Sequence, residues 1–268
     1  MLQIIFAAVS MIFYLGATIT LTKGLFSSQG VAVNQLRALS AIAVFTHVIL
    51  VGLEIFTPTG QDLSLINVVS LVCLIISLSV TLMTYKIPAP FLLTVVYGFA
   101  AFVQLTTIFF PKHVLVTQFF ANAPLTGHIT LSLLAYCVII IATLYALQFQ
   151  FISRKLKRKD AAIVSGHFPP LMQVEKQQFH LLSIGTLLLS AALLTGFIYL
   201  DDMFAQSVAH KTILSIIAWV IFVGLLVGHK YRGFRGKSAV TATLTGAIIL
   251  TLAYFGSRFV KEIILGRF

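Results

Sequence analysis

The chain has 268 residues, of which 59% are hydrophobic and 9% are charged, and its mean hydropathy is +1.03. A soluble domain carries about a quarter charged residues, so this composition excludes a mainly soluble protein. The net charge of +11 would suit a nucleic-acid partner, but the basic residues lie between apolar runs. We therefore expect them to set the orientation in a lipid bilayer, with no nucleic acid bound.

Long apolar runs recur along the whole chain. The hydrocarbon core of a bilayer needs about 20 apolar residues per helix, and these runs lack the alternation of a membrane barrel. The sequence therefore predicts an all-α integral membrane protein, a bundle of about eight transmembrane helices. The predicted spans are residues 3–22, 38–56, 64–84, 90–110, 127–148, 180–200, 212–228 and 239–257.

Basic residues are concentrated in alternate connections, above all in the run RKLKRK at Arg154–Lys159. Positively charged loops face the cytoplasm, so we expect a multi-pass protein of the bacterial inner membrane with both termini outside. We divide it into an N-terminal portion, residues 1–126, and a C-terminal portion, residues 127–268, each with four spans. Pro169 and Pro170 predict a break in the basic connection, followed by a short amphipathic stretch.

The histidines are the main candidates for chemistry. In this orientation His128 and His210 lie near the outer surface, where two imidazoles on neighbouring helix ends form a candidate metal site. Interfacial histidines are also often only the polar ends of helices. His47 lies near the middle of the second span, and Glu54 follows on the same helix face. This pair predicts either a polar lining or a hydrogen-bonded helix contact.

The sequence lacks the residues that several classes of function require. The sequence contains no GxSxG, HExxH or phosphate-binding glycine loop. Pumps and secondary transporters usually carry several charged groups at mid-membrane, and here only His47 qualifies. The sequence therefore favours a binding protein that is not an enzyme. A small-solute pathway past His47 and Glu54 is a further alternative.

Five segments occur in the order found in one known family. They are HITLSLLAY from His128, the stretch Pro169–Gly196, AWVIF around Trp219, GFRGKSA from Gly233 and AYFG from Ala253. Together they resemble the core domain of the CcsA and CcmC cytochrome c assembly proteins over residues 127–257. The chain length and short loops are most similar to the smaller YpjD- and HemX-type branch.

The resemblance implies haem as a cofactor, bound or presented at the outer membrane face for cytochrome c assembly. His128 matches the first outer histidine of that family, and Tyr136 lies in the same segment. The family's tryptophan-rich loop here reads FIYLDDMFAQSVAHK, without tryptophan, and its second outer histidine falls on Leu265. We hypothesise that His210 replaces this histidine as the second iron ligand. His47 is a further candidate for haem contact.

The missing tryptophans support an alternative. A scaffold of this family that has lost its haem site would act as a regulatory or partner subunit in the membrane. The basic run Arg154–Lys159 would then bind a cytochrome-assembly protein, another membrane protein or anionic lipid. The simpler interpretation is that this run only sets the membrane topology.

Overall fold

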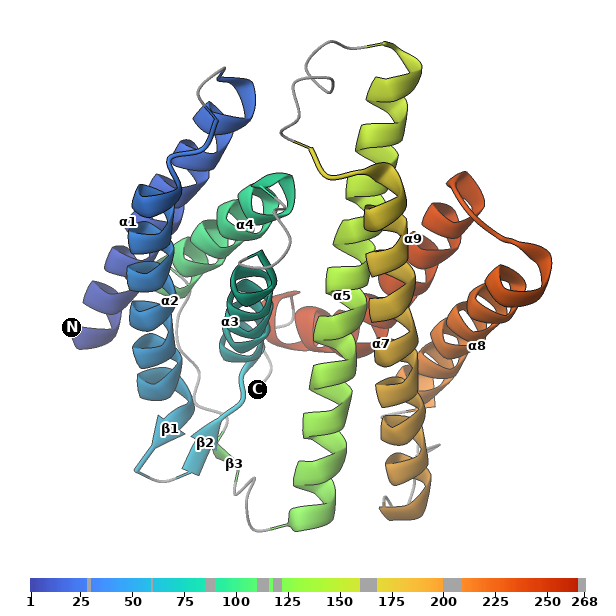
Figure 1. Ribbon diagram of the computed structural model, residues 1–268. Helices are drawn as coiled ribbons and strands as arrows, with labels where there is room; N and C mark the ends of the chain where they lie inside the picture. Colours follow the sequence, from blue (N-terminus) through green and yellow to red (C-terminus); the bar gives the residue numbers. More distant parts are fainter. Residues whose placement is uncertain are drawn as a thin grey trace. The chain divides into compact units, whose positions relative to one another are not determined.

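The computed structural model describes residues 1–27, 30–58, 60–84, 90–109, 116–117, 122–159, 168–199 and 209–264. These residues are mostly helical (Figure 1). The helices are α1 Leu2–Phe26, α2 Val33–Ile55, α3 Leu65–Thr84, α4 Pro90–Phe109, α5 Ala123–Lys157, α7 Leu171–Tyr199, α8 Ala209–Arg232 and α9 Lys237–Thr251, followed by the π-helices η2 Leu252–Gly256 and η3 Phe259–Ile264. Among the described residues, eight helices are long and apolar enough to cross a membrane. The predicted all-α membrane fold is confirmed.

Two helices extend furthest beyond the predicted spans. Helix α5 continues through the apolar run into the basic residues as far as Lys157, and α7 begins directly after Pro170. Proline lacks a backbone N–H, so it suits the start of a helix, where that donor would have no helical partner. The amphipathic stretch predicted after Pro170 is therefore the first two turns of α7 and not a separate element.

A small antiparallel sheet was not predicted. Strand β1 (Phe56–Thr57) pairs with β2 (Gly60–Asp62), with Phe56 opposite Gln61. Strand β3 (Val116–Thr117) pairs with β2 on its other side. Strands of two or three residues are too short to show a period of alternating residues, so the sequence does not indicate them.

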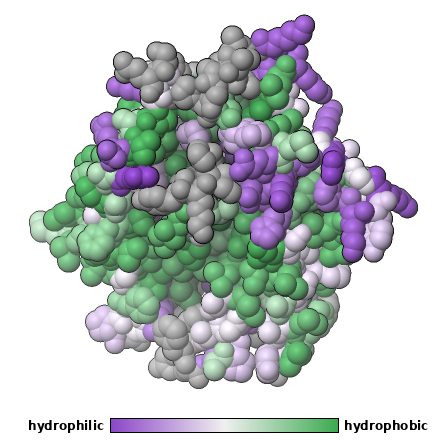
Figure 2. Space-filling model, viewed as in Figure 1, coloured by the Kyte–Doolittle hydropathy of each residue, from purple (hydrophilic) through white to green (hydrophobic). Residues whose placement is uncertain are grey.

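The distribution of side chains is that of a protein in lipid. Large apolar residues such as Phe45 and Leu187 are 66% and 71% exposed. Polar residues such as Ser10, Ser70 and Gln104 are completely buried. The surface seen in Figure 2 is correspondingly hydrophobic over much of its area. An exposed apolar surface of this kind is stable only against acyl chains, so lipid is a partner of this protein.

The chain forms two compact units. The first comprises residues 1–117 and 155–169, and the second comprises residues 118–154 and 170–268. In the first, α1 packs against α2 and α4, and α3 packs against α2 and α4. In the second, α8 packs against α7 and α9. Whether the portions 1–126 and 127–268 are functional domains stays a prediction.

Glycines permit close approach between helices of the second unit. A Cβ atom added to Gly185 of α7 would lie 2.6 Å from Cγ1 of Ile139 on α5. A Cβ atom at Gly246 of α9 would overlap the ring of Phe222 on α8. By contrast, nothing lies within 4 Å of the corresponding position at Gly224. The first two positions therefore need glycine, and Gly224 does not.

Candidate functional site

His128 lies in the second turn of α5, where its half-buried ring faces α7. Its Nδ1 is 2.9 Å from the carbonyl oxygen of Ala192 and 3.4 Å from Oγ1 of Thr195. Because a carbonyl can only accept, Nδ1 carries the proton and donates it to Ala192. The neutral ring then has its lone pair on Nε2. Within the described part of the chain, Nε2 has no hydrogen-bond partner.

This arrangement is the one that metal-binding histidines use. A ligating imidazole usually donates its second ring N–H to a carbonyl or carboxylate, which fixes the tautomer and the orientation of the ring. The carbonyl of Ala192 supplies that acceptor here. His128 can therefore offer Nε2 to a metal without further rearrangement of its tautomer.

Tyr136 lies two turns further along α5 and is 7% exposed. Its hydroxyl is 3.1 Å from Oγ1 of Thr251, and its ring stacks on Tyr254 with centroids 5.4 Å apart. Phe255 contacts the same ring edge-on. The side chain thus joins α5 to the C-terminal end of α9 and to η2. Its visible role is helix packing in the aromatic cluster Tyr136, Tyr254 and Phe255.

His210 is exposed in the first turn of α8. The residues 200–208 that precede this helix, with most of the tryptophan-free loop, lie outside the described residues, as does Leu265. No hydrogen bond between His128 and His210 is present in the described ranges. The same ranges contain no group of three or more His, Cys, Asp or Glu residues placed to hold a metal ion. A haem needs only one or two protein ligands, so the pairing of these histidines stays a prediction.

His47 is in the first unit and is completely buried on α2. Its Nδ1 is 3.2 Å from the hydroxyl of Tyr14 on α1. Its Nε2 is 3.1 Å from Oγ of Ser70 on α3 and 2.7 Å from the amide nitrogen of Gln104 on α4. One imidazole therefore joins α1, α2, α3 and α4. We call His47, Tyr14, Ser70 and Gln104 the His47 cluster.

The amide of Gln104 determines the tautomer of this ring. Since the amide nitrogen donates to Nε2, the ring proton is on Nδ1 and is donated to the hydroxyl oxygen of Tyr14. A half-turn of the amide, together with movement of the ring proton to Nε2, would reverse both hydrogen bonds. The Oε1 atom of Gln104, which has no partner among the described residues, would then accept from Nε2.

Other polar groups extend the His47 cluster along α3. Asn67, Ser70, Ser77 and Thr81 recur at the spacing of one helix face. At one end, the amide of Asn67 donates to the backbone oxygens of Asp62 and, at 3.4 Å, Glu54. At the other, Oγ1 of Thr81 is 2.7 Å from the hydroxyl of Tyr97. His47 makes hydrogen-bonded helix contacts, because each of its ring nitrogens lies within hydrogen-bond distance of a side chain on another helix. The Glu54 side chain is also buried.

The chain matches the family described as Cytochrome C assembly protein over residues 9–265. The chain belongs to the cytochrome c assembly protein family. Inner membrane protein YpjD of Escherichia coli strain K12 is 38% identical to it over 263 residues, which cover 97% of this chain and 99% of YpjD. YpjD of strain O157:H7 has the same identity and coverage.

A more partial relative is an uncharacterized 28.8 kDa protein of Azospirillum brasilense, which is 34% identical over 141 residues, 52% of each chain. No solved structure matches the chain. The match to YpjD confirms the resemblance to the YpjD-type branch. Its described residues include eight helices that are able to span a membrane, and this member of the family is a multi-pass protein of the inner membrane.

The sequence does not reveal the hydrogen-bond partners of His128 and His47. Ala192 acts through its backbone oxygen. Every residue has such an oxygen, so the sequence does not single out Ala192 as a partner of His128. Tyr14, Ser70 and Gln104 are each in a different helix, so only the packing of the helices shows that they meet at His47. The signal that could have identified them is a polar side chain in the middle of an apolar span.

Proposed function

We propose that this member of the cytochrome c assembly family binds haem through His128 and presents it at the outer membrane face. The hydrogen bond from Nδ1 of His128 to the Ala192 oxygen supports the proposal, because it leaves Nε2 as a ligand atom for iron. His128 would therefore hold the haem iron through Nε2. His210 is our candidate for the second iron ligand, and the protein has no reaction of its own.

The ligand test uses protein purified gently from its native membrane. We expect a haem Soret band in the wild type and its loss in His128→Gly, with partial recovery when imidazole is added. His180→Gly, at an exposed position of α7, is the matched control and should keep the band. A wild type that neither carries nor binds haem would refute haem binding. An unchanged spectrum in His128→Gly would refute the role of His128.

The orientation has its own test. Both native cysteines, Cys73 and Cys137, are buried, so a single added cysteine can be labelled against a low background. We expect a membrane-impermeant maleimide to label His210→Cys in intact spheroplasts. Lys157→Cys should react only after the membrane is permeabilised. The reverse pattern would show that the orientation is wrong and would place His210 on the cytoplasmic side.

The alternative is a regulatory or partner subunit without haem. The absence of tryptophan from FIYLDDMFAQSVAHK favours it, since indole rings would supply a flat apolar surface for a porphyrin. Under this proposal the exposed basic residues Lys157 and Arg158 contact a cytoplasmic partner. A colourless wild-type protein that co-purifies with one stoichiometric partner would support it.

A further inference from the structure

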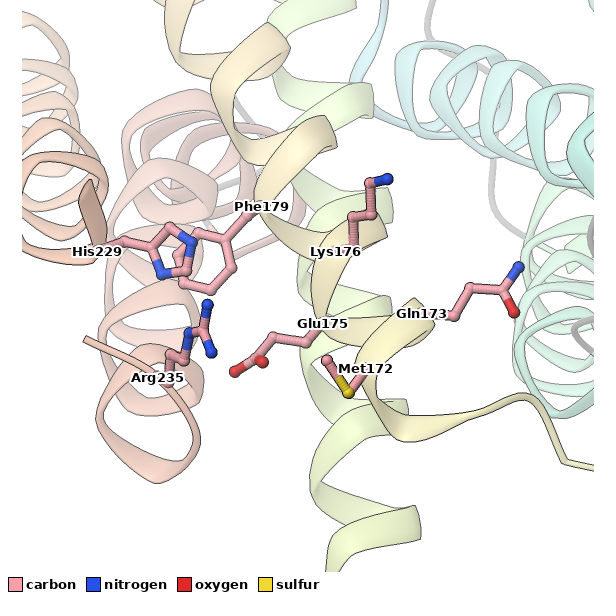
Figure 3. A pocket seen from close by; sticks show the side chains of 7 residues that line it. All are labelled: Met172, Gln173, Glu175, Lys176, Phe179, His229 and Arg235. Carbon is pink, nitrogen blue, oxygen red and sulfur yellow. The ribbon is translucent and has the colours of Figure 1, made fainter. Parts of the chain in front are cut away.

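A cavity of about 420 Å³ opens where three segments of the second unit meet. They are the first turns of α7, the last turn of α8 and the connection that leads to α9. Figure 3 shows its lining, with the ring of His229 lying over that of Phe179 and the side chains of Arg235 and Glu175 nearby. The remaining lining residues are Met172, Gln173 and Lys176.

The connection between α8 and α9 has a defined shape. Gly233 and Gly236 have φ angles of 67° and 61°, which favour glycine. Nδ1 of His229 lies 2.8 Å from the carbonyl oxygen of Phe234 and donates to it. The imidazole also stacks on Phe179, with centroids 3.6 Å apart and planes 14° from parallel. These contacts hold one wall of the cavity in place without a ligand.

The charges of the lining suit an anion. Lys176 and Arg235 are exposed, and within the described ranges neither has an ion-pair partner. The one carboxylate, that of Glu175, accepts the backbone N–H of Gly236 at 3.2 Å. Two unpaired cations thus face one carboxylate that already has a hydrogen bond. An anion with several acceptor oxygens would offer each cation a partner.

The surroundings point to the bilayer as the source of that anion. Tyr231, in the last turn of α8, is 74% exposed, and Phe234, in the connection, is 43% exposed. The Nζ atom of Lys230 lies 5.4 Å from the centre of the Tyr231 ring. Exposed aromatic and basic residues together are typical of the headgroup layer. The cavity is also partly apolar, through Met172 and Phe179.

We propose that this cavity binds the phosphate headgroup of an anionic phospholipid. Arg235 and Lys176 bind the phosphate oxygens, and Met172 and Phe179 contact the glycerol and the upper part of the acyl chains. The site is separate from His128 and does not depend on haem binding.

The test measures lipid retention by native mass spectrometry of protein taken from nanodiscs of phosphatidylcholine with increasing phosphatidylglycerol. Wild-type protein should retain phosphatidylglycerol, and Lys176→Gln/Arg235→Gln should lower its affinity about tenfold. Lys23→Gln/Arg37→Gln removes the same charge from exposed positions of the first unit, outside both the cavity and the Arg154–Lys159 run, and should change the affinity less than twofold. The fluorescence of Trp219, the sole tryptophan, should be the same in all three proteins and so exclude unfolding.

Three results would overturn the proposal. Equal losses in both double variants would show general attraction to basic residues, and unchanged retention in the cavity variant would show that the cavity is not used. Competition by millimolar inorganic phosphate that removes the bound lipid would identify a free-phosphate site. Selective loss in the cavity variant, without displacement by phosphate, is the result expected of a lipid site.

Discussion

Replacing His47 by leucine should destabilise the first unit more than any other single substitution of a histidine. The change leaves the hydroxyls of Tyr14 and Ser70 and the amide of Gln104 buried without their common partner. Interhelical hydrogen bonds in membranes contribute about 0.6 kcal/mol on average and up to about 1.7 kcal/mol each. With the cost of unsatisfied buried groups, the expected loss is about 2 to 4 kcal/mol.

Thiol reactivity can locate this effect in the first unit. Cys73 is buried on α3, one turn beyond Ser70, and Cys137 is in the other unit. In a Cys137→Ala background, heating with a thiol-reactive fluorophore reports the exposure of Cys73 alone. His47→Leu should lower by several degrees the temperature at which Cys73 becomes reactive. His47→Gln keeps a hydrogen-bonding group near Ser70 and Gln104, so it should lower this temperature less. His180→Leu is the control. If Cys73 became reactive at the same temperature in His180→Leu and His47→Leu, the prediction would be contradicted.

Replacing Gly185 by leucine should separate α5 from α7. Its Cβ would lie 2.6 Å from Cγ1 of Ile139 and 3.3 Å from the Ile139 backbone nitrogen, so a rotamer change of Ile139 cannot relieve the whole overlap. Overpacking of this kind costs about 1 to 3 kcal/mol. The separation would also lengthen the hydrogen bond between His128 and Ala192, which joins the same two helices.

Intrinsic fluorescence is suited to this second prediction. The indole of Trp219 donates to Oγ of Ser190 at 2.7 Å, so its emission follows the packing of α8 on α7. Gly185→Leu should lower the unfolding midpoint in detergent, whereas Gly224→Leu should not, because space is open around Gly224. Similar midpoints for the two variants would show that helix propensity, and not the contact with Ile139, determines stability.

The helices could be predicted from the sequence because the bilayer imposes a length and a composition on every span. Their ends were less predictable. Hydropathy falls at Arg154 and at Gln178, but the helices do not end there, since polar residues also form helices outside the hydrocarbon layer. Membership of the family could also be predicted from the sequence, because it rests on motifs in a fixed order, such as HITLSLLAY.

The sites were less predictable because they depend on contacts between distant residues. His128 was selected from its motif, but its orientation depends on an oxygen 64 residues later in the chain. Tyr136 belongs to the same motif, but its hydroxyl forms a hydrogen bond with Oγ1 of Thr251, 115 residues later in the chain. The cavity beside His229 combines residues of α7 with the glycine-containing turn before α9, and neither segment alone indicates it.

The length of α5 has a consequence for any protein that meets its C-terminal end. At about 1.5 Å per residue, its 35 residues extend about 52 Å, whereas a bilayer with its headgroups is about 40 to 45 Å thick. The last turns, with Arg154, Lys155 and Lys157, therefore extend into water as ordered helix. A partner binding there would not have to offset the conformational entropy that ordering a flexible loop requires.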